Sequence, residues 1–179
     1  HGDSSRGWAD TGQLGASLKA IHWPGLIDEG EFRARVEFRP IDMRDLSDLP
    51  SEHYDFMWSS CSFEHLGSLD AGAAFVHDAM RLLRSGGVAV HTTEFNVSSN
   101  DETVAKGGNV IYRRQDIERL DGRLRKIACG IEALDFEAGT DPHDLAFDVP
   151  PYYQAGKQHL KLKMMGHIST SILLIVRKG

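Results

Sequence analysis

The chain has 179 residues, of which 41% are hydrophobic and 26% are charged. That length and composition suit one globular domain with its own hydrophobic core, and they argue against disordered and fibrous proteins. The formal net charge of -6 argues against a protein whose affinity comes mainly from nucleic-acid phosphates.

In chain order, the first elements expected are short. The hydrophobic spacing predicts a helix over 13–21, and residues 31–35 predict one or two further helical turns. Residues 36–39 alternate apolar and polar side chains before Pro40, which predicts an edge strand, because a proline there leaves no ladder partner unpaired. The compact apolar run at 54–58 predicts a buried strand.

The clearest helix is predicted over 70–84, where apolar side chains recur on one stripe and a Ser-Gly-Gly turn follows. The rest of the chain predicts, in order, a strand over 88–93, a helix over 115–127, a strand over 131–136, a polar loop over 137–157 and a strand over 170–177. Strands that alternate with helices in this way predict an α/β sheet with helices on both faces. Open sheets of that class bind ligands beyond the carboxyl ends of their strands, which here are residues 42–44, 59–65 and 91–96.

Membrane, disulfide and metal functions find no support in the sequence. No apolar run approaches the roughly 20 residues that span a bilayer, and the N-terminus lacks the pattern of a signal peptide. Cys61 and Cys129 are too few for a disulfide framework, so we expect a cytoplasmic protein. No histidine is spaced from a cysteine or an acid as in zinc sites, so we expect no metal. The partner expected is a small-molecule substrate, with no nucleic acid and no membrane, and a homo-oligomer stays open.

Three segments at these strand ends resemble the class I methyltransferases that use S-adenosylmethionine. Residues 40–46, with the sequence PIDMRDL, resemble the segment that closes their third strand. Residues 54–66 resemble their fourth strand and the loop after it, and residues 81–90 resemble the following helix, glycine turn and fifth strand. The resemblance implies a Rossmann-like, three-layer α/β/α fold with a mostly parallel sheet and an antiparallel last strand. It also implies S-adenosylmethionine as the cofactor.

The resemblance further implies where that cofactor binds. In the family, an acid at the end of the third strand accepts a hydrogen bond from the adenine, and the next residue packs against the ring. These roles correspond to Asp42 and Met43. The loop after the fourth strand borders the methionine end of the cofactor, which here points to Ser59, Ser60 and Cys61.

Candidate catalytic residues follow the fourth strand directly. Glu64 and His65 can act as a general base or contact the substrate, because histidine titrates near neutral pH and carboxylates can be tuned by their surroundings. The alternative is that both residues cap a helix and suit its dipole. Substrate contacts are expected from His91, Glu94, Tyr152 and His159. His91 can instead be a buried, hydrogen-bonded strand residue. Residues 148–152 are expected to form a rigid turn over the pocket.

One part of the family's pattern has no counterpart in this sequence. Nothing resembles the first strand, glycine-rich turn, first helix and second strand, and such a unit needs roughly 30 residues or more. We therefore expect residues 1–179 to form a single methyltransferase-like domain that lacks its N-terminal part. The function expected is methyl transfer to an oxygen or nitrogen of a small molecule. The alternatives are a non-catalytic binding or assembly subunit and another Rossmann-like enzyme, such as a dinucleotide oxidoreductase.

Overall fold

The computed structural model describes residues 15, 17–154, 156 and 158–179, in two compact units that divide after residue 42. The first unit contains two short helices, α2 (Leu18–Ile21) and α3 (Glu29–Arg35). Ser17 and Asp28 cap them, because their side-chain oxygens accept hydrogen bonds from backbone N–H groups of the first turn. The helical turns expected at 31–35 are thus confirmed.

Two other expectations for the first unit need correction. The edge strand expected at 36–39 is wrong, because residues 36–42 form no strand. A strand needs ladder hydrogen bonds from a neighbour, and none of the described strands pairs with this stretch. The helix expected over 13–21 is confirmed only over Leu18–Ile21, and residues 13, 14 and 16 lie outside the described part of the chain.

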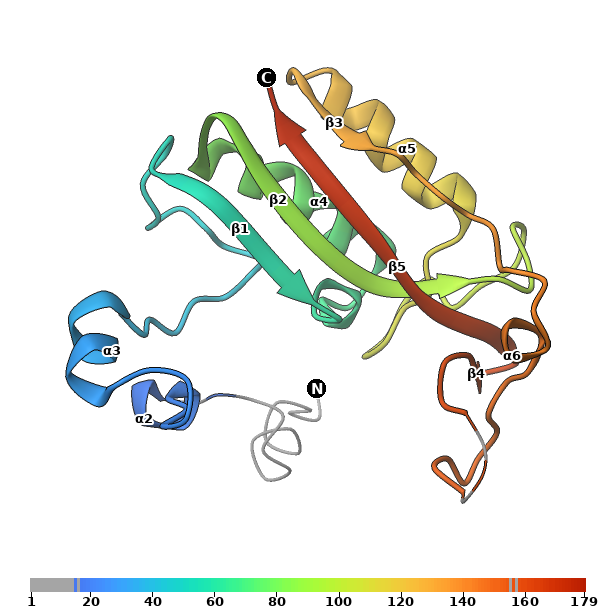
Figure 1. Cartoon of the computed structure of the whole chain (residues 1–179). Helices are drawn as coiled ribbons and strands as arrows, with labels where there is room; N and C mark the ends of the chain where they lie inside the picture. The colour runs from blue at the N-terminus through green and yellow to red at the C-terminus, as the bar shows by residue number, and fades with distance from the viewer. Residues whose placement is uncertain (1–14, 16, 155, 157) are drawn as a thin grey trace. The chain divides into compact units, whose positions relative to one another are not determined.

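The second unit is built on a five-stranded sheet (Figure 1). Its strands are β1 (Tyr54–Ser60), β2 (Leu83–Asn96), β3 (Cys129–Glu132), β4 (Leu162–Met164) and β5 (His167–Lys178). The order across the sheet is β1-β2-β5-β3, with β4 paired to β5. β1 runs parallel to β2, whereas β5 is antiparallel to β2, β3 and β4. The α/β class and the antiparallel last strand are therefore confirmed, whereas the sheet expected to be mostly parallel has one parallel pair among its four described strand pairs.

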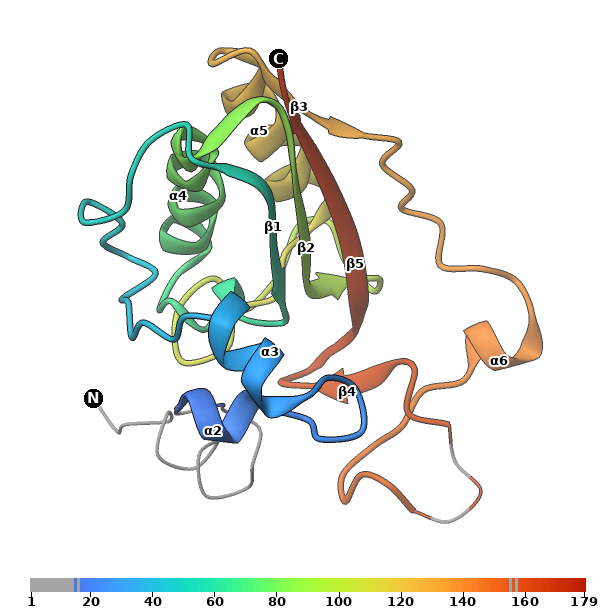
Figure 2. The same ribbon diagram turned by 60° about the vertical axis from the view of Figure 1, so that its left-hand side comes forward.

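The two main helices, α4 (Leu69–Ala79) and α5 (Arg114–Arg125), cover the same face of the sheet (Figure 2). Short 3-10 helices flank α4, namely η1 (Phe63–His65) before it and η2 (Met80–Leu82) after it. The helix expected over 70–84 ends earlier than predicted, because Leu83 already pairs with Tyr54 at the start of β2. The helix expected over 115–127 is confirmed by α5.

The hydrophobic core lies between these helices and the sheet. Its residues without exposed surface include Ala89, Leu174 and Val176 from the sheet and Val76, Ile117 and Leu124 from the helices. Burying a valine, leucine or isoleucine side chain completely stabilises a fold by about 1.5–3 kcal/mol relative to leaving it exposed. This single packed layer is therefore the main source of stability in the second unit.

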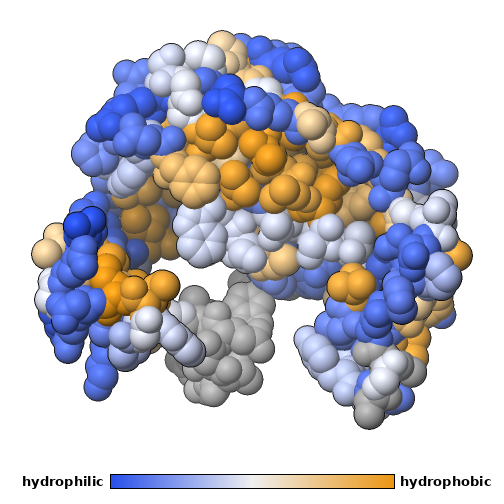
Figure 3. Space-filling model, in the orientation of Figure 1, coloured by the Kyte–Doolittle hydropathy of each residue, from blue (hydrophilic) through white to orange (hydrophobic). Residues whose placement is uncertain are grey.

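The opposite face of the sheet is apolar and exposed. Phe56 and Trp58 of β1 are 56% and 70% exposed, and Leu173 of β5 is 53% exposed. Figure 3 shows apolar side chains gathered on this face, over β1, β2 and β5. The prediction at 54–58 is thus right about the strand and wrong about its burial. The reason is that β1 ends the sheet and that no long helix in the described part of this unit covers the face.

The C-terminal part differs from expectation mainly in its loops. β3 ends at Glu132 rather than at residue 136, because Ala133 has a φ of 43° and leaves the extended conformation. The loop expected over 137–157 contains a four-residue helix, α6 (Pro142–Leu145). The short strand β4, which the sequence did not predict, follows this loop. The strand expected over 170–177 is confirmed and extended by β5. No described helix has the length and apolar composition needed to cross a membrane.

We expect Gly72→Ala in α4 to destabilise the fold. A Cβ atom at Gly72 would lie 2.1 Å from the Tyr112 hydroxyl oxygen and 2.6 Å from the Phe63 carbonyl oxygen. Overpacking of this kind costs about 1–3 kcal/mol, which exceeds the helix propensity that alanine adds. Urea unfolding followed by circular dichroism should therefore show a lower midpoint for the variant.

Gly122→Ala in α5 is the matched control. Nothing lies within 4 Å of a Cβ atom placed there. Alanine should stabilise this helix by about 0.5–1 kcal/mol, because glycine loses more backbone entropy on folding. If both variants moved the urea midpoint in the same direction, the packing around Gly72 would not be as described.

Candidate functional site

The carboxyl ends of β1 and β2 lie side by side, because Ser60 pairs with Thr92 in the parallel register. Side chains alternate between the two faces of a sheet, so the polar residues at this edge divide into two groups. We call the residues on the helix-covered face the buried group: Ser59, Glu64, His91 and Thr93. We call the residues on the other face the open group: Ser60, Cys61, Thr92, Glu94 and Ser171.

His91 is the centre of the buried group and has no exposed surface. Its Nδ1 lies 2.8 Å from the Ser59 hydroxyl oxygen, and its Nε2 has no hydrogen-bond partner in the described structure. The edges of Phe63 and Phe75 pack beside the imidazole, with ring centroids 6.1 and 5.9 Å away. This burial lowers the pKa of His91 from its ordinary 6.5 to about 4. The side chain is therefore neutral at pH 7, and the structure supports the buried strand histidine over a substrate ligand.

Glu64 lies in η1 and is also fully enclosed. Its Oε2 accepts a hydrogen bond of 3.1 Å from the Thr93 hydroxyl, and its Oε1 has no partner among the described residues. Burial raises the pKa of this carboxyl, since the charged form loses its hydration. The Glu64 carbonyl oxygen accepts from the Val110 amide at 3.0 Å, so the residue joins η1 to the segment after β2. A catalytic contact by Glu64 stays a prediction, and the carboxyl has no surface that faces solvent.

His65, the other predicted base, is only half buried. Its Nδ1 lies 2.7 Å from the Gly108 carbonyl oxygen. A carbonyl can only accept a hydrogen bond, so Nδ1 carries the proton and the neutral ring holds its lone pair on Nε2.

The open group contains two of the predicted cofactor residues. Cys61 has a φ of 42°, and its amide donates to both the carbonyl and the hydroxyl oxygen of Thr92, each at 3.1 Å. Its Sγ lies 3.5 Å from the Thr92 hydroxyl and 3.7 Å from the Ser171 hydroxyl. Thr92 falls within the strand end predicted at 91–96 without having been singled out, whereas Ser171 was not predicted as a site residue. The tight turn at Cys61 therefore ends β1 with a row of small polar groups.

Glu94 completes the open group and is held from two directions. Its Oε2 accepts a hydrogen bond of 2.7 Å from the Ser169 hydroxyl of β5. Its backbone carbonyl accepts from the Tyr112 amide at 2.8 Å, so the strand end is tied to the returning chain. Ser169 is buried and was not anticipated, because its contact with Glu94 joins positions 75 residues apart.

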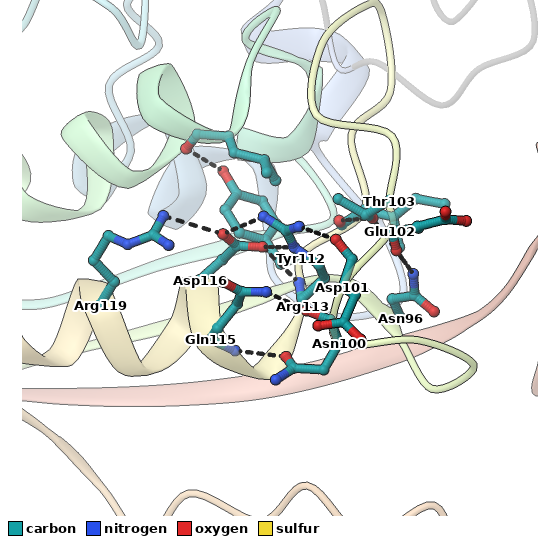
Figure 4. Close-up of polar contacts among 12 residues, drawn as sticks. Asn96, Asn100, Asp101, Glu102, Thr103, Tyr112, Arg113, Gln115, Asp116 and Arg119 are labelled. Carbon is teal, nitrogen blue, oxygen red and sulfur yellow. Dashed lines mark hydrogen bonds and ion pairs between the residues drawn. The ribbon is translucent and has the colours of Figure 1, made fainter.

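The segment between β2 and α5 is fixed by a polar network (Figure 4). The Asn96 side chain donates a hydrogen bond to the Glu102 carbonyl at 3.0 Å. The backbone N–H of Gln115 donates to the Asn100 side-chain oxygen at 2.9 Å. Arg113 donates two hydrogen bonds to the buried Asp116 carboxylate, at 2.8 and 3.1 Å. This network holds the chain beside the carboxyl end of β2, and with it the positions of Glu94 and His65.

Of the two residues predicted to hold adenine, only Met43 belongs to the same unit as this edge. Asp42 is the exposed last residue of the first unit. Met43, the first residue of the second unit, lines a cavity of about 760 Å³ beside α4 together with Phe75, Met80 and Cys129. The lining of that cavity includes none of Ser59, Ser60 and Cys61. Adenine contacts by Asp42 and Met43 therefore stay predictions.

Tyr152 and His159 lie in the long loop before β4 and contact other loop residues. His159 Nδ1 lies 2.9 Å from the buried Asp148 carboxylate, and its ring stacks on Tyr153 at 3.7 Å. This hydrogen bond lowers the pKa of Asp148. Tyr152 donates its hydroxyl to the Lys163 carbonyl at 2.8 Å. The loop is thus internally braced, and Leu162 pairs with Ser169, the residue that holds Glu94.

One family model matches part of the chain. Residues 14–91 match a family model described as a methyltransferase domain. No curated protein sequence matches the chain.

The solved structures named here are distant in sequence. The [4+2]-cyclase SpnF is 15% identical with a TM-score of 0.51, over 84% of this chain and 58% of that one. An S-adenosylmethionine-dependent methyltransferase from Mesorhizobium loti is 13% identical with a TM-score of 0.48, over 83% and 74%. An O-methyltransferase family protein from Burkholderia thailandensis is 14% identical with a TM-score of 0.48, over 99% and 42%. The chain thus spans 58% of the length of SpnF, and the similarity shows the fold alone.

Acidification should destabilise the protein through His91. Its pKa in the folded state lies below the 6.5 of an exposed histidine, so its contribution is complete above pH 6.5 and is lost as the pH falls towards 4. The loss at pH 4 is about 3 kcal/mol for a shift of this size. Urea unfolding from pH 7.5 to 4 should show less pH dependence for His91→Gln than for the parent. His53→Gln, at an exposed position, is the control and should leave the parent's pH dependence unchanged.

Glu64 should make the protein less stable as the pH rises, which is the opposite of the effect expected for His91. Its pKa in the folded state is raised above 4.5, so its contribution is complete below pH 4.5 and is lost as the pH rises through the folded value. Glu64→Gln keeps an acceptor for Thr93 without the buried charge, so the variant should melt higher than the parent at pH 8. The two proteins should melt alike near pH 4.5. Glu102→Gln, on the exposed surface, should show no such crossover, and an equal gain there would argue against the role of burial.

Proposed function

We propose that the chain is a class I, S-adenosylmethionine-dependent methyltransferase domain that takes part in methyl transfer to an oxygen or nitrogen of a small molecule, and the match of residues 14–91 to a methyltransferase-domain model supports this. The observation that carries this proposal is the open group. Ser60, Cys61 and Glu94 gather at the carboxyl ends of two parallel strands, which is where open α/β sheets bind their ligands.

The residues at the end of β1 suit the amino-acid part of the cofactor. The hydroxyl of Ser60 can donate to a carboxylate and accept from an ammonium group, and Ser171 adds a second hydroxyl on the same face. When bound, S-adenosylmethionine supplies a methyl group activated by its sulfonium. Asp42 is proposed to accept a hydrogen bond from the adenine amino group, with Met43 against the ring.

The acceptor side of the proposed site contains Glu94 and His65. The Glu94 carboxylate, oriented by Ser169, can bind a cationic acceptor or take a proton from a hydroxyl acceptor. His65 is proposed as a second general base or substrate contact, with its Nδ1 held by the Gly108 carbonyl. The rate of such a reaction depends mostly on the alignment of acceptor and methyl group. The braced loop that contains Tyr152 and His159 is proposed to contact the substrate next to Glu94.

Titration of S-adenosylhomocysteine into the full chain by calorimetry tests the proposal, with NAD as the comparison ligand. We expect saturable binding of S-adenosylhomocysteine and no binding of NAD. Asp42→Asn should weaken that binding by about tenfold or more, because a hydrogen bond to a charged group contributes about 1.5–3 kcal/mol. Asp48→Asn is the matched control in the following loop and should bind as the parent does.

The other outcomes separate the alternatives. A folded sample that binds neither ligand would favour a non-catalytic binding or assembly subunit. Binding of NAD in place of S-adenosylhomocysteine would favour a dinucleotide enzyme. Binding that Asp42→Asn leaves unchanged would contradict the adenine contact while keeping the cofactor.

A further inference from the structure

The loop before β4 contains a histidine that a buried aspartate holds by one ring nitrogen. Asp148 has no exposed surface, and its carboxylate lies 2.9 Å from Nδ1 of His159. The same carboxylate accepts hydrogen bonds from the backbone N–H groups of Val149 and Tyr153, at 2.8 and 3.0 Å. These hydrogen bonds, first of all the one with His159, lower the pKa of Asp148. The carboxylate is therefore charged at neutral pH.

The contact with Asp148 decides which ring nitrogen of His159 can accept a proton. An ionised carboxylate only accepts hydrogen bonds, so Nδ1 is the donor and the neutral ring has its lone pair on Nε2. No described residue forms a hydrogen bond with that Nε2. Tyr153 stacks on the ring at 3.7 Å and Tyr152 packs edge-on, which leaves 24% of the side chain exposed. His159 is thus held in one orientation with one basic nitrogen available.

Asp148 and His159, which we call the dyad, lie near Glu94. Asp148 pairs with Leu162 of β4 in a parallel bridge, and Leu162 pairs with Ser169 of β5. Residues directly opposite in neighbouring strands project to the same face, and adjacent strands are about 4.8 Å apart. Asp148 therefore lies about 10 Å from Ser169, whose hydroxyl holds Glu94 on the open face. A small molecule bound beside Glu94 is within reach of the dyad.

We propose that His159 is the general base for the acceptor, that Asp148 is its positioning residue, and that the acceptor is a phenol. This inference rests on the proposed function of methyl transfer. In the step, a bond forms between the acceptor oxygen and the methyl carbon, and the carbon–sulfur bond breaks with its electron pair left on sulfur. The hydroxyl proton moves to Nε2 of His159, and the Asp148 carboxylate stabilises the imidazolium that forms.

His159 suits this step better than the other two candidate bases of the proposed site. A carboxylate such as that of Glu94 is a weaker base than an imidazole. His65 has its Nδ1 against the neutral Gly108 carbonyl, which stabilises an imidazolium less than a carboxylate does. The buried charge of Asp148 therefore distinguishes His159 as the proton acceptor.

The strength of this base points to a phenol. The phenol of tyrosine has a pKa of about 10, whereas an aliphatic alcohol is about as weak an acid as water, whose pKa is about 15.7. An imidazole titrates near neutral pH, so the proton of a phenol is the more accessible one. Tyr153 and Leu160 add exposed aromatic and apolar surface next to the dyad, which suits an aromatic ring.

Absorbance titration of 3-nitrophenol into the full chain tests the dyad without the cofactor. The phenolate of this probe absorbs at longer wavelength than the phenol, and the free probe is mostly un-ionised at pH 7. We expect the bound probe to be ionised, with its proton on His159. His159→Gln should lower the ionised fraction of the bound probe by about tenfold or more, because the neighbouring positive charge is lost. Asp148→Asn should give an intermediate value.

Affinity separates loss of the base from collapse of the loop. Calorimetry with the same probe should show an affinity within about threefold of the parent for His159→Gln, whereas a collapsed loop would bind it far more weakly. His77→Gln is the matched control and should behave as the parent does. His77 lies 2.8 Å from the Asp78 carboxylate with 27% of its side chain exposed, but on α4, which covers the other face of the sheet (Figure 2).

Three results would overturn the proposal. The parent could fail to bind 3-nitrophenol, could bind it un-ionised, or could ionise it no better than His159→Gln does. Any of these together with saturable binding of S-adenosylhomocysteine would reject the dyad as base and keep the proposed methyl transfer. An ionised probe on a protein that does not bind S-adenosylhomocysteine would instead reject methyl transfer and keep the dyad as a phenol site.

Transfer of a methyl group to 3-nitrophenol completes the test. With S-adenosylmethionine present, the parent should release S-adenosylhomocysteine, and His159→Gln should lower kcat by about 10²–10⁴-fold, the usual contribution of a general base. Binding of S-adenosylhomocysteine should be the same in both proteins. A parent that binds both molecules and transfers no methyl group, or a variant with the parent's kcat, would contradict the role of His159.

Discussion

The alternation of side chains along β2 is the constraint on which the rest of the second unit depends. β2 pairs with β1 on one side and with β5 on the other, and its pleat sends successive residues to opposite faces. His91 and Thr93 consequently enter the core under α4 and α5, whereas Thr92 and Glu94 reach the open face. A slip of one residue in the register would exchange the two sets and bring the core side chains to the surface.

The buried group beneath the strand ends imposes a cost on the fold. His91 Nε2 and Glu64 Oε1 are enclosed without partners, and a buried polar atom left unsatisfied is destabilising. Protonation of the imidazole as the pH falls and ionisation of the carboxyl as the pH rises would each place a charge in this layer. Polar groups retained in a core despite such a cost are typical of functional regions, because packing alone does not require them. Their position directly under the open group agrees with that interpretation.

The fold narrows the function without defining it. SpnF, which resembles this chain with a TM-score of 0.51, is described as a [4+2]-cyclase, so the fold by itself does not define the reaction. The choice of acceptor therefore depends on side chains beyond the strand ends. In this chain these are Glu94 with its Ser169 anchor and the braced loop around Asp148 and His159.

The sequence by itself determined the order and type of the main elements and the resemblance to the methyltransferase family. Helix and strand periodicity are local, and the segments around α4, α5, β1 and β2 each contain a complete pattern. The sequence also indicated which strand ends would contain the candidate site. The isolated pattern at 36–39 failed because an edge strand exists only where another strand pairs with it.

Only the tertiary structure decided which of the site residues face solvent and which lie in the core. Glu64 and Trp58 show this most clearly, since the predicted base is enclosed and the residue from the predicted buried strand is exposed. Burial depends on neighbours distant along the chain. Thr93 and α4 enclose Glu64, whereas Trp58 lies on an edge strand whose outer face has no covering helix among the described residues of its unit. No local pattern contains that information, because the contacts that decide it form only when the sheet and its helices have assembled.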